Sequence, residues 1–410
     1  MEEYEIYTLP NGIRIVHKQV THTQIAHCGL MLDVGSRDEE PHQIGIAHFW
    51  EHMAFKGTKK RKSFHILNRL ESVGGELNAY TTKEKICFHA SVLDKHFEKA
   101  IELLTDITFE SIFPEKQIEK ERSVILEEMA MYYDSPEDAI QDDFDGVLFE
   151  GHPLGYNILG TSDSVRAFRK SDFLEFIAQN LNTERVIFSS VSNLPFRKVV
   201  ELAKKYLADI PMHSARKERL PFQNYVPKHR RVIRPISQAH CAIGRTAYPL
   251  ADSRRLPFFM LVNLLGGPAM NSRLNLALRE KYGFVYSVEA NYTPYIDTGF
   301  MAVYFATEKK QLNKSISLVL RELKLLRETP LGRMQLHGLK EQLIGQLAMS
   351  EESNVNFMLM MAKSILDMNR VDKLDEIFES VHQITAKDLQ DLANEMFEED
   401  QMSLLTFVPE

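Results

Sequence analysis

The sequence predicts an α+β protein built from two copies of one domain, each a mostly antiparallel sheet with helices packed on one face. The tripeptide AHC occurs at residues 26–28 and again at residues 239–241 of the 410-residue chain. The strand and helix expected at 86–107 resemble those expected at 299–323. A repeat of about 210 residues is too long for a solenoid unit, and it therefore indicates a duplicated domain.

Each element expected in the first copy follows from a local pattern. Residues 4–20 alternate between apolar and polar side chains around a Pro-Asn-Gly turn at 10–12, which is typical of a hairpin. Helical periodicity that ends at two glycines predicts a helix at 64–73. Further strands are expected at 24–34, 76–82, 84–93 and 186–191, and further helices at 94–108, 114–133, 171–180 and 199–207.

A polar stretch separates the two copies. Residues 211–229 carry prolines at positions 211, 221 and 227, which is typical of a linker. We therefore expect a first domain at 1–212, a linker at 213–228 and a homologous second domain at 229–410.

Composition narrows the class of protein. The net charge of −8 disfavours nucleic acid and anionic membranes as partners. The 3 cysteines are widely spaced in apolar runs and are expected to be buried free thiols in a reducing compartment. The acidic N-terminus and the lack of a long apolar segment predict neither a signal peptide nor a membrane span, so a cytoplasmic protein is expected.

The strongest chemical signal is the motif H-x-x-E-H formed by His48, Glu51 and His52. On a helix these three side chains project from one side, and two imidazoles four residues apart can hold one zinc ion. A surface helix can carry two histidines by chance. The apolar residues on both sides of this motif predict a largely buried helix instead, where unpartnered polar groups would be costly.

The duplication supports a special role for this helix. In the second copy, the positions of the three motif residues are taken by Phe258, Leu261 and Val262. A helix that only packs against its sheet needs no histidines there, so chemistry is the simplest account of the first copy. A catalytic zinc needs a third protein ligand, and the acidic helix at 114–133 offers three candidates: Glu121, Glu127 and Glu128.

These motifs resemble the pitrilysin/insulinase family of zinc peptidases, the inverzincins, and most closely their short processing-peptidase-like branch. The resemblance covers nearly the whole chain and is strongest at 48–58, with further matches at 78–81, at 151–161 and in an R-x6-Y pair at 279–286. Trp50 stands where the family usually has leucine, and this one difference does not weaken the resemblance.

The resemblance implies a zinc-dependent endopeptidase with one Zn²⁺ per chain. It places the third ligand at Glu128, a supporting glutamate at Glu121 and the general base at Glu51. It also implies that the substrate adds a strand beside Asn78, Ala79 and Tyr80, and that Arg279 and Tyr286 hold the substrate near the metal. Without the resemblance, Arg279 would be expected to pair with a neighbour such as Glu280, and Tyr286 to pack in a core.

Two further expectations concern specificity and assembly. Asp138 and Asp142 lie four residues apart. Family members with acidic residues near these positions recognise an arginine of the substrate, so a preference for a basic residue close to the cleaved bond is expected. The alternative is that the two residues belong to a solvated acidic face. Longer family members join four such domains, with the metal in the first and the arginine–tyrosine pair in the fourth. A homodimer with sites shared between chains is therefore expected. The alternative function is that of a non-catalytic partner subunit, although such subunits typically lose motif residues.

Overall fold

The computed structural model describes residues 4–215 and 218–410, so residues 216 and 217 of the predicted linker lie outside the described part. The chain forms two compact units that interleave along the sequence. The first unit comprises Met1–Met129, Tyr156–Arg219 and Met349–Val371, and the second comprises Ala130–Gly155, Leu220–Ala348 and Asp372–Glu410.

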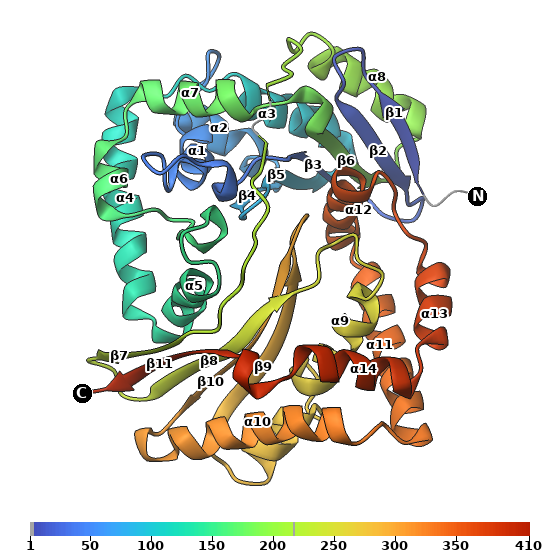
Figure 1. Cartoon of the computed structure of the whole chain (residues 1–410). Coiled ribbons are helices and arrows are strands. Elements are labelled where there is room, and N and C mark those ends of the chain that lie inside the picture. The colour runs from blue at the N-terminus through green and yellow to red at the C-terminus, as the bar shows by residue number, and fades with distance from the viewer. Residues whose placement is uncertain (1–3, 216–217) are drawn as a thin grey trace. The chain divides into compact units, whose positions relative to one another are not determined.

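A six-stranded mixed sheet forms the centre of the first unit (Figure 1). In spatial order its strands are β1 (Glu5–Thr8), β2 (Arg14–Gln19), β6 (Val186–Ser192), β3 (Ile25–Leu32), β5 (Ile86–Leu93) and β4 (Glu76–Thr81). Neighbours are antiparallel except β2 and β6, which are parallel. In the described part of the chain β4 pairs with β5 alone, so its outer edge carries backbone groups without a strand partner.

Helices cover both faces of this first sheet. One face buries a large apolar cluster with α1 (Ile46–Ala54), α2 (Ser63–Glu71), α3 (Phe97–Phe109), α4 (Glu115–Asp134), α7 (Lys170–Asn180) and α8 (Phe196–Leu207). The other face packs against α12 (Asn354–Met368), which Figure 1 shows on the side away from α3 and α8. Met358 and Met361 of α12 share an apolar cluster with Met31 and Ile187 of the sheet.

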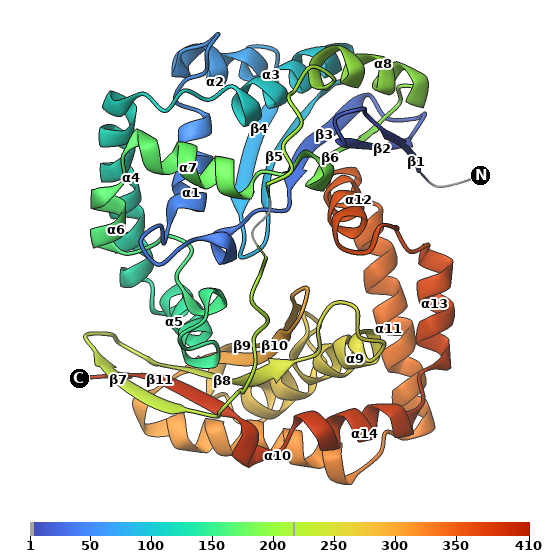
Figure 2. The same cartoon turned by 45° about the horizontal axis from the view of Figure 1, so that its top comes forward.

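The second unit repeats this plan with a five-stranded mixed sheet. Its strands, in spatial order, are β7 (His229–Arg234), β11 (Ser403–Pro409), β8 (Ala239–Ala247), β10 (Gly299–Thr307) and β9 (Val285–Pro294). One face packs against α9 (Arg255–Gly266), α10 (Leu312–Glu328) and α14 (Ala386–Met396). The other face packs against α5 (Pro136–Leu148), which Figure 2 shows across the sheet from α10.

The two halves of the sequence exchange one helix each. α5 follows α4 in the first half of the chain but belongs to the second unit, and α12 follows α11 (Arg333–Glu351) in the second half but belongs to the first. Both faces of each sheet are apolar, so each sheet must pack against helices on both of its faces. The compact units therefore differ from the predicted domains 1–212 and 229–410 in residues 130–155 and 349–371.

The predicted fold class is confirmed. The prediction placed helices on one face of each sheet, and the exchanged helices α5 and α12 lie on the other face. The described residues also form the α-helices α6 (Ser162–Ala167) and α13 (Leu374–Gln383), a π-helical turn at Asn275–Glu280 and several short 3-10 turns. No helix within the described residues has the length and apolar composition needed to cross a bilayer. The predicted linker has no long regular element in its described residues, but it is anchored at Arg219, whose side chain is only 9% exposed.

Candidate metal centre

Helix α1 is fixed so that its motif residues share one side. Ile46, Phe49 and Trp50 are buried in the core of the first unit, which leaves the opposite side of the helix to His48, Glu51 and His52. The helix begins after Gly45, whose φ of 98° is unfavourable for other residues. A side chain at Gly45 would also lie 2.7 Å from Cα of Gly160, so the loop that matches the family packs directly against the start of this helix.

The N-terminus of α1 is held by a buried carboxylate. Glu39, 1% exposed, accepts hydrogen bonds of 2.9 Å from the backbone N–H groups of Gly45 and Ala47. Burial raises the pKa of Glu39 to about 8, although these two hydrogen bonds oppose the change. A negative charge here would also be stabilised by the helix dipole. Glu39 therefore fixes the helix that carries the motif.

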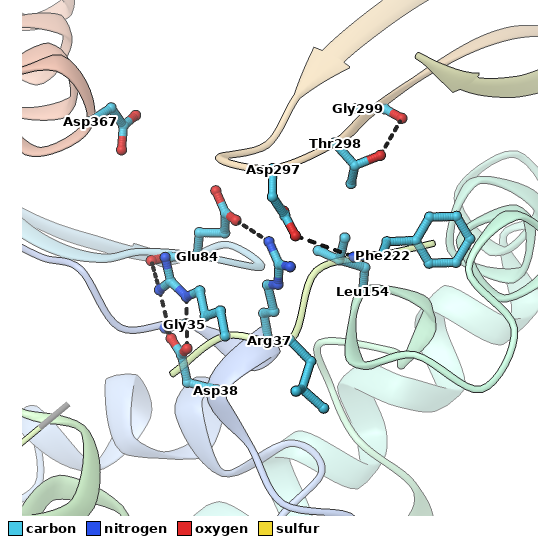
Figure 3. A network of polar contacts seen from close by, with 12 residues as sticks. Gly35, Arg37, Asp38, Glu84, Leu154, Phe222, Asp297, Thr298, Gly299 and Asp367 are labelled. Atoms are coloured by element: carbon cyan, nitrogen blue, oxygen red, sulfur yellow. Dashed lines mark hydrogen bonds and ion pairs between the residues drawn. The ribbon is translucent and has the colours of Figure 1, made fainter. Parts of the chain in front are cut away.

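The loop before α1 is tied to the turn between β4 and β5. Arg37 forms a 2.6 Å ion pair with Glu84, and the backbone N–H of Gly35 donates to the carboxylate of Asp38 at 2.9 Å (Figure 3). Asp38 also accepts a hydrogen bond of 2.7 Å from the guanidinium of Arg219. These contacts bind Arg219 of the predicted linker and the β4–β5 turn to the segment that leads into the motif helix.

Three side chains from α1 and α4 gather at one point. Nε2 of His48 lies 3.8 Å from Glu128 Oε1, and Nε2 of His52 lies 3.5 Å from Glu128 Oε2. Within the described residues this is the one group of three or more histidine, cysteine or acidic side chains whose ligand atoms all lie within 4.8 Å of one another. Ligand atoms on a tetrahedral zinc are separated by roughly 3.3 Å, from Zn–N and Zn–O distances near 2.0–2.1 Å, so the cluster fits this ion.

The structure distinguishes the three acidic candidates on α4. Glu128 completes the cluster, while Glu127 is exposed to solvent. Glu121 lies on the same helical face as Glu128, and its Oε2 is 3.3 Å from Nδ1 of His52. A carboxylate on Nδ1 orients the imidazole and leaves Nε2 as the ligand atom. Lys56, which is 2.8 Å from the other oxygen of Glu121, balances its charge.

The two histidines have opposite electrostatic environments. Burial, together with the neighbouring His52, lowers the pKa of His48 to about 4, although Glu128 opposes the change. Burial would also lower the pKa of His52, but hydrogen bonds to Glu121 and Glu128 outweigh it and raise the value to about 9. An imidazole binds a metal in its neutral form, so a cation held in the cluster would favour that form for both histidines.

Glu51 lies beside the cluster and is positioned by the edge strand. Thr81, the last residue of β4, donates a 2.6 Å hydrogen bond from its hydroxyl to Oε2 of Glu51. Burial raises the pKa of Glu51, and the bond from Thr81 opposes that change. A buried carboxylate next to a metal cluster is suited to accept a proton. The predicted substrate residues Asn78, Ala79 and Tyr80 precede Thr81 on the same edge strand, in the order exposed, half-buried and half-buried.

The other predicted site residues belong to the second unit. Tyr286 on β9 is 87% exposed, so it does not pack in a core. The guanidinium of Arg279 lies 5.9 Å from the Tyr286 ring, and its Nε is 3.7 Å from Glu280. Asp138 on α5 is exposed and accepts a 2.6 Å hydrogen bond from Ser135, while Asp142 is half-buried.

The motifs do not reveal the roles of several residues of the site, although Thr81 lies within the matched segment 78–81. Glu39, Thr81 and Arg219 each act through a contact with a residue at least eight positions away in the sequence. Lys56 lies within the matched segment 48–58, but nothing in the sequence indicates that it pairs with Glu121.

Comparison with known proteins identifies a family over most of the chain. Residues 14–162 match the family described as Insulinase (Peptidase family M16), and residues 167–343 match Peptidase M16 inactive domain. The chain is 31% identical over 397 residues to "Uncharacterized zinc protease YmxG" of Bacillus subtilis, covering 96% of both chains. It is 30% identical over 396 residues to an "Uncharacterized zinc protease" of Rickettsia bellii, covering 97% of this chain and 95% of the relative.

Solved structures show the same fold. A protease from Helicobacter pylori superposes with a TM-score of 0.91 at 21% identity, with all of both chains covered. A structure described as a peptidase M16 inactive domain from Pseudomonas fluorescens superposes with a TM-score of 0.92 at 17% identity, covering 99% of this chain and 98% of that one. Both likenesses cover the residues of both units.

Proposed function

The chain belongs to peptidase family M16, and on that premise we propose that it is a zinc-dependent endopeptidase acting on peptides or unfolded segments. The observation that carries the proposal is the cluster of His48, His52 and Glu128, with Glu51 held beside it by Thr81. One zinc ion per chain follows from this single cluster in the described residues. The relatives named zinc proteases support the same metal.

The proposed mechanism assigns a separate task to each side chain. His48, His52 and Glu128 would hold zinc, which when bound polarises a water molecule and the scissile carbonyl. Glu51 accepts a proton from the attacking water and later donates one to the leaving amine. Glu121 keeps the ring of His52 in the orientation that presents Nε2, and Thr81 keeps Glu51 from turning away.

The edge of β4 is the proposed substrate site. An extended peptide can add a strand to an open sheet edge, where main-chain hydrogen bonds supply affinity without demanding a particular sequence. β4 offers such an edge beside Asn78, Ala79 and Tyr80, and it ends at the residue that holds the general base. Folded proteins present few free strands, so peptides and unfolded segments are the expected substrates.

The second unit is proposed to contribute to the same reaction. Arg279 would hold the substrate, and Tyr286 would donate a hydrogen bond to the oxyanion of the tetrahedral intermediate. The high exposure of Tyr286 supports a role outside the core of its own unit. By resemblance to longer family members, we propose that the pair serves the metal of another chain, which requires a homodimer with shared sites.

A non-catalytic role is the alternative, since residues 167–343 match a domain described as inactive. The second copy indeed has Phe258, Leu261 and Val262 in place of the motif. The first copy retains all of it, and the three ligands lie together, which argues for an active first unit.

Peptide cleavage under metal control tests the proposal. A peptide library is digested by the purified protein with and without a zinc chelator, and bound zinc is measured by mass spectrometry. We expect cleavage that the chelator abolishes, that added zinc restores and that the Glu51→Gln variant lacks. Cleavage that survives both zinc removal and Glu51→Gln would contradict the assignment.

A further inference from the structure

A cavity of about 110 Å³ lies in the second unit, between α5 and the face of the sheet that this helix covers. Its polar lining comes from four elements: Glu137 and Gln141 on α5, His240 on β8, Ser287 and Glu289 on β9, and Tyr304 on β10. None of these residues takes part in the metal cluster, and His240 belongs to a sequence pattern described above, the repeated AHC tripeptide.

The strand register explains why these side chains meet. Tyr304 pairs with Glu289 on one side and with Ala242 on the other, while Ala306 pairs with His240. Because side chains alternate along a strand, these residues share the face that packs against α5. Ala306 and Ser287 are small and lie near the start of α5, so the space beneath the helix is not filled.

The floor of the cavity is a buried phenol without a hydrogen-bond partner. Tyr304 is 8% exposed, and within the described residues no hydrogen bond reaches its hydroxyl. Its ring is fixed at a centroid distance of 6.2 Å from Phe144 of α5. The hydroxyl opens into the cavity and is not among the sealed polar atoms of the core, so a polar ligand that enters the cavity can form a hydrogen bond with it.

The mouth of the cavity carries uncompensated negative charge. Glu137 and Glu289 form no ion pair in the described part of the chain, and both residues are exposed at the rim. Burial raises the pKa of Glu289, and repulsion from Glu137 adds to the change, although a hydrogen bond with Asn291 opposes it. Burial raises the pKa of Tyr304, and nearby Asp145, Glu289 and Asp142 add to this effect. The cavity is therefore a region of negative potential.

We propose that this cavity binds a guanidinium or ammonium group, with Glu137 and Glu289 as counterions and the Tyr304 hydroxyl as a hydrogen-bond acceptor. An anion would be repelled by the same two carboxylates. A metal ion is not favoured, because the carboxylates of Glu137 and Glu289 and the imidazole of His240 do not form a group of ligand atoms within 4.8 Å of one another. An organic cation fits a partly aromatic pocket, since the ring face of Tyr304 attracts positive charge as well.

The proposal goes beyond peptide hydrolysis and does not depend on it. The cation has two sources, a small free molecule such as an amino acid or amine, or a basic side chain of a bound polypeptide. The cavity also differs from the specificity residues predicted on α5, because Asp138 and Asp142 are absent from its lining.

Calorimetric titration of the full-length protein with L-argininamide tests the site. Norleucinamide serves as the uncharged control ligand, and the salt concentration is held constant. We expect argininamide to bind and norleucinamide not to bind. Glu137→Gln and Glu289→Gln should each weaken argininamide binding by roughly tenfold, because charge-assisted hydrogen bonds are about twice as strong as neutral ones. Tyr304→Phe should weaken it less, because the ring remains.

A matched variant separates the pocket from general electrostatics. Glu308→Gln removes one negative charge from the second unit at a surface ion pair with Lys310 and should leave affinity within twofold of wild type. Equal weakening by Glu308→Gln, equal binding of norleucinamide, or no argininamide binding would overturn the proposal. Glu137 lies at the exposed rim, so its variant carries the test if Glu289→Gln fails to fold.

A second pair of ligands identifies the source of the cation. A ten-residue peptide with one central arginine is compared with the same peptide carrying norleucine, again against the Glu137→Gln variant. Tighter binding of the arginine peptide than of argininamide, lost with Glu137→Gln, would support a polypeptide side chain. Equal affinities that both depend on Glu137 would support a small free cation.

Discussion

The hydroxyl of Thr81 donates a 2.6 Å hydrogen bond to the carboxylate of Glu51. One residue ends the edge strand of the first sheet, and the other lies on the helix that carries the metal ligands. The proposed general base and the proposed substrate strand are thus joined by a single contact. A peptide paired with β4 would be placed in register with Glu51 by that contact.

Replacing Thr81 with valine should slow turnover while leaving the metal in place. The substitution keeps the branched shape and removes the hydroxyl, so the Glu51 carboxylate loses a hydrogen bond worth about 1.5–3 kcal/mol. We expect kcat to fall at least roughly tenfold, with bound zinc unchanged. Thr81→Ser retains a hydroxyl and should recover most of the activity. Loss of zinc in Thr81→Val would show that the residue supports the fold of the cluster instead.

Two glutamate variants test the assignment of the ligands. Glu128→Gln should release zinc, because the carboxylate beside His48 and His52 is lost. Glu127→Gln is the control on the same helix and should retain zinc and activity, since Glu127 is exposed. Bound zinc is measured by mass spectrometry after gel filtration. If Glu127→Gln released the metal and Glu128→Gln did not, the cluster would be wrongly assigned.

How much of this site could be read from the sequence differs from residue to residue. The spacing of His48, Glu51 and His52 predicts their common side because helical geometry is local. The third ligand could not be chosen from spacing, since Glu121 and Glu128 share one face of α4 and only packing decides which of them reaches both histidines. The resemblance to a family supplied that choice.

The parts of the fold that escaped prediction depend on long-range contacts. α12 has an apolar face like any buried helix, and nothing in its own sequence shows that it packs on the sheet formed by the other half. The burial of Arg219 could not be predicted from the polar linker around it, because its guanidinium pairs with Asp33 and Asp38, which lie far away in the sequence. The periodicity of apolar residues shows which face of a helix or strand is buried, but it does not show which element packs against that face.

Asp33 should make the first unit sensitive to acid. Burial would raise the pKa of Asp33, but Arg219, Lys85 and Arg185 outweigh it and hold the value at about 2, below the ordinary 3.8. A carboxylate with a lowered pKa in the folded state stabilises the protein above its unfolded pKa, and this stabilisation is lost as pH falls through the folded value. Its contribution at neutral pH is about 2 kcal/mol.

Denaturant unfolding of Asp33→Asn measures this contribution. The fluorescence of Trp50, the one tryptophan of the chain, reports on the first unit because this residue is buried on α1. We expect the free energy of unfolding at pH 7 to fall by about 2 kcal/mol or more, and the difference from wild type to shrink below about pH 4. Asp391→Asn, at a surface pair with Lys387, should change it by less than about 0.5 kcal/mol. A difference that does not depend on pH would exclude Asp33 as the titrating group.

Asp138 and Asp142 should favour a basic residue near the cleaved bond. They lie four residues apart on α5, and a pair of carboxylates facing a guanidinium forms charge-assisted hydrogen bonds. Cleavage of arginine and norleucine peptides is compared for the wild type and the double variant Asp138→Asn/Asp142→Asn. We expect the preference for arginine to fall at least roughly tenfold. An unchanged ratio would mean that the pair is only a solvated acidic face.

Subunit mixing tests whether the second unit of one chain serves the metal of another. Two variants are prepared separately, Glu51→Gln and the double variant Arg279→Ala/Tyr286→Phe. Each homodimer should be nearly inactive, because each variant damages both of its sites. Neither change affects a proposed metal ligand, so both proteins should retain zinc.

In a mixed dimer the two defects are distributed unequally between the sites. The site with an intact Glu51 belongs to the chain with the damaged pair, and it receives the intact Arg279 and Tyr286 from its partner. The other site has both defects. One of the two sites in each mixed dimer is therefore whole. In an equal mixture half of the dimers are mixed, so activity should return toward about a quarter of the wild-type value as subunits exchange. Exchange is followed by native mass spectrometry. If mixed dimers form and activity does not return, the pair acts within its own chain or has no part in catalysis.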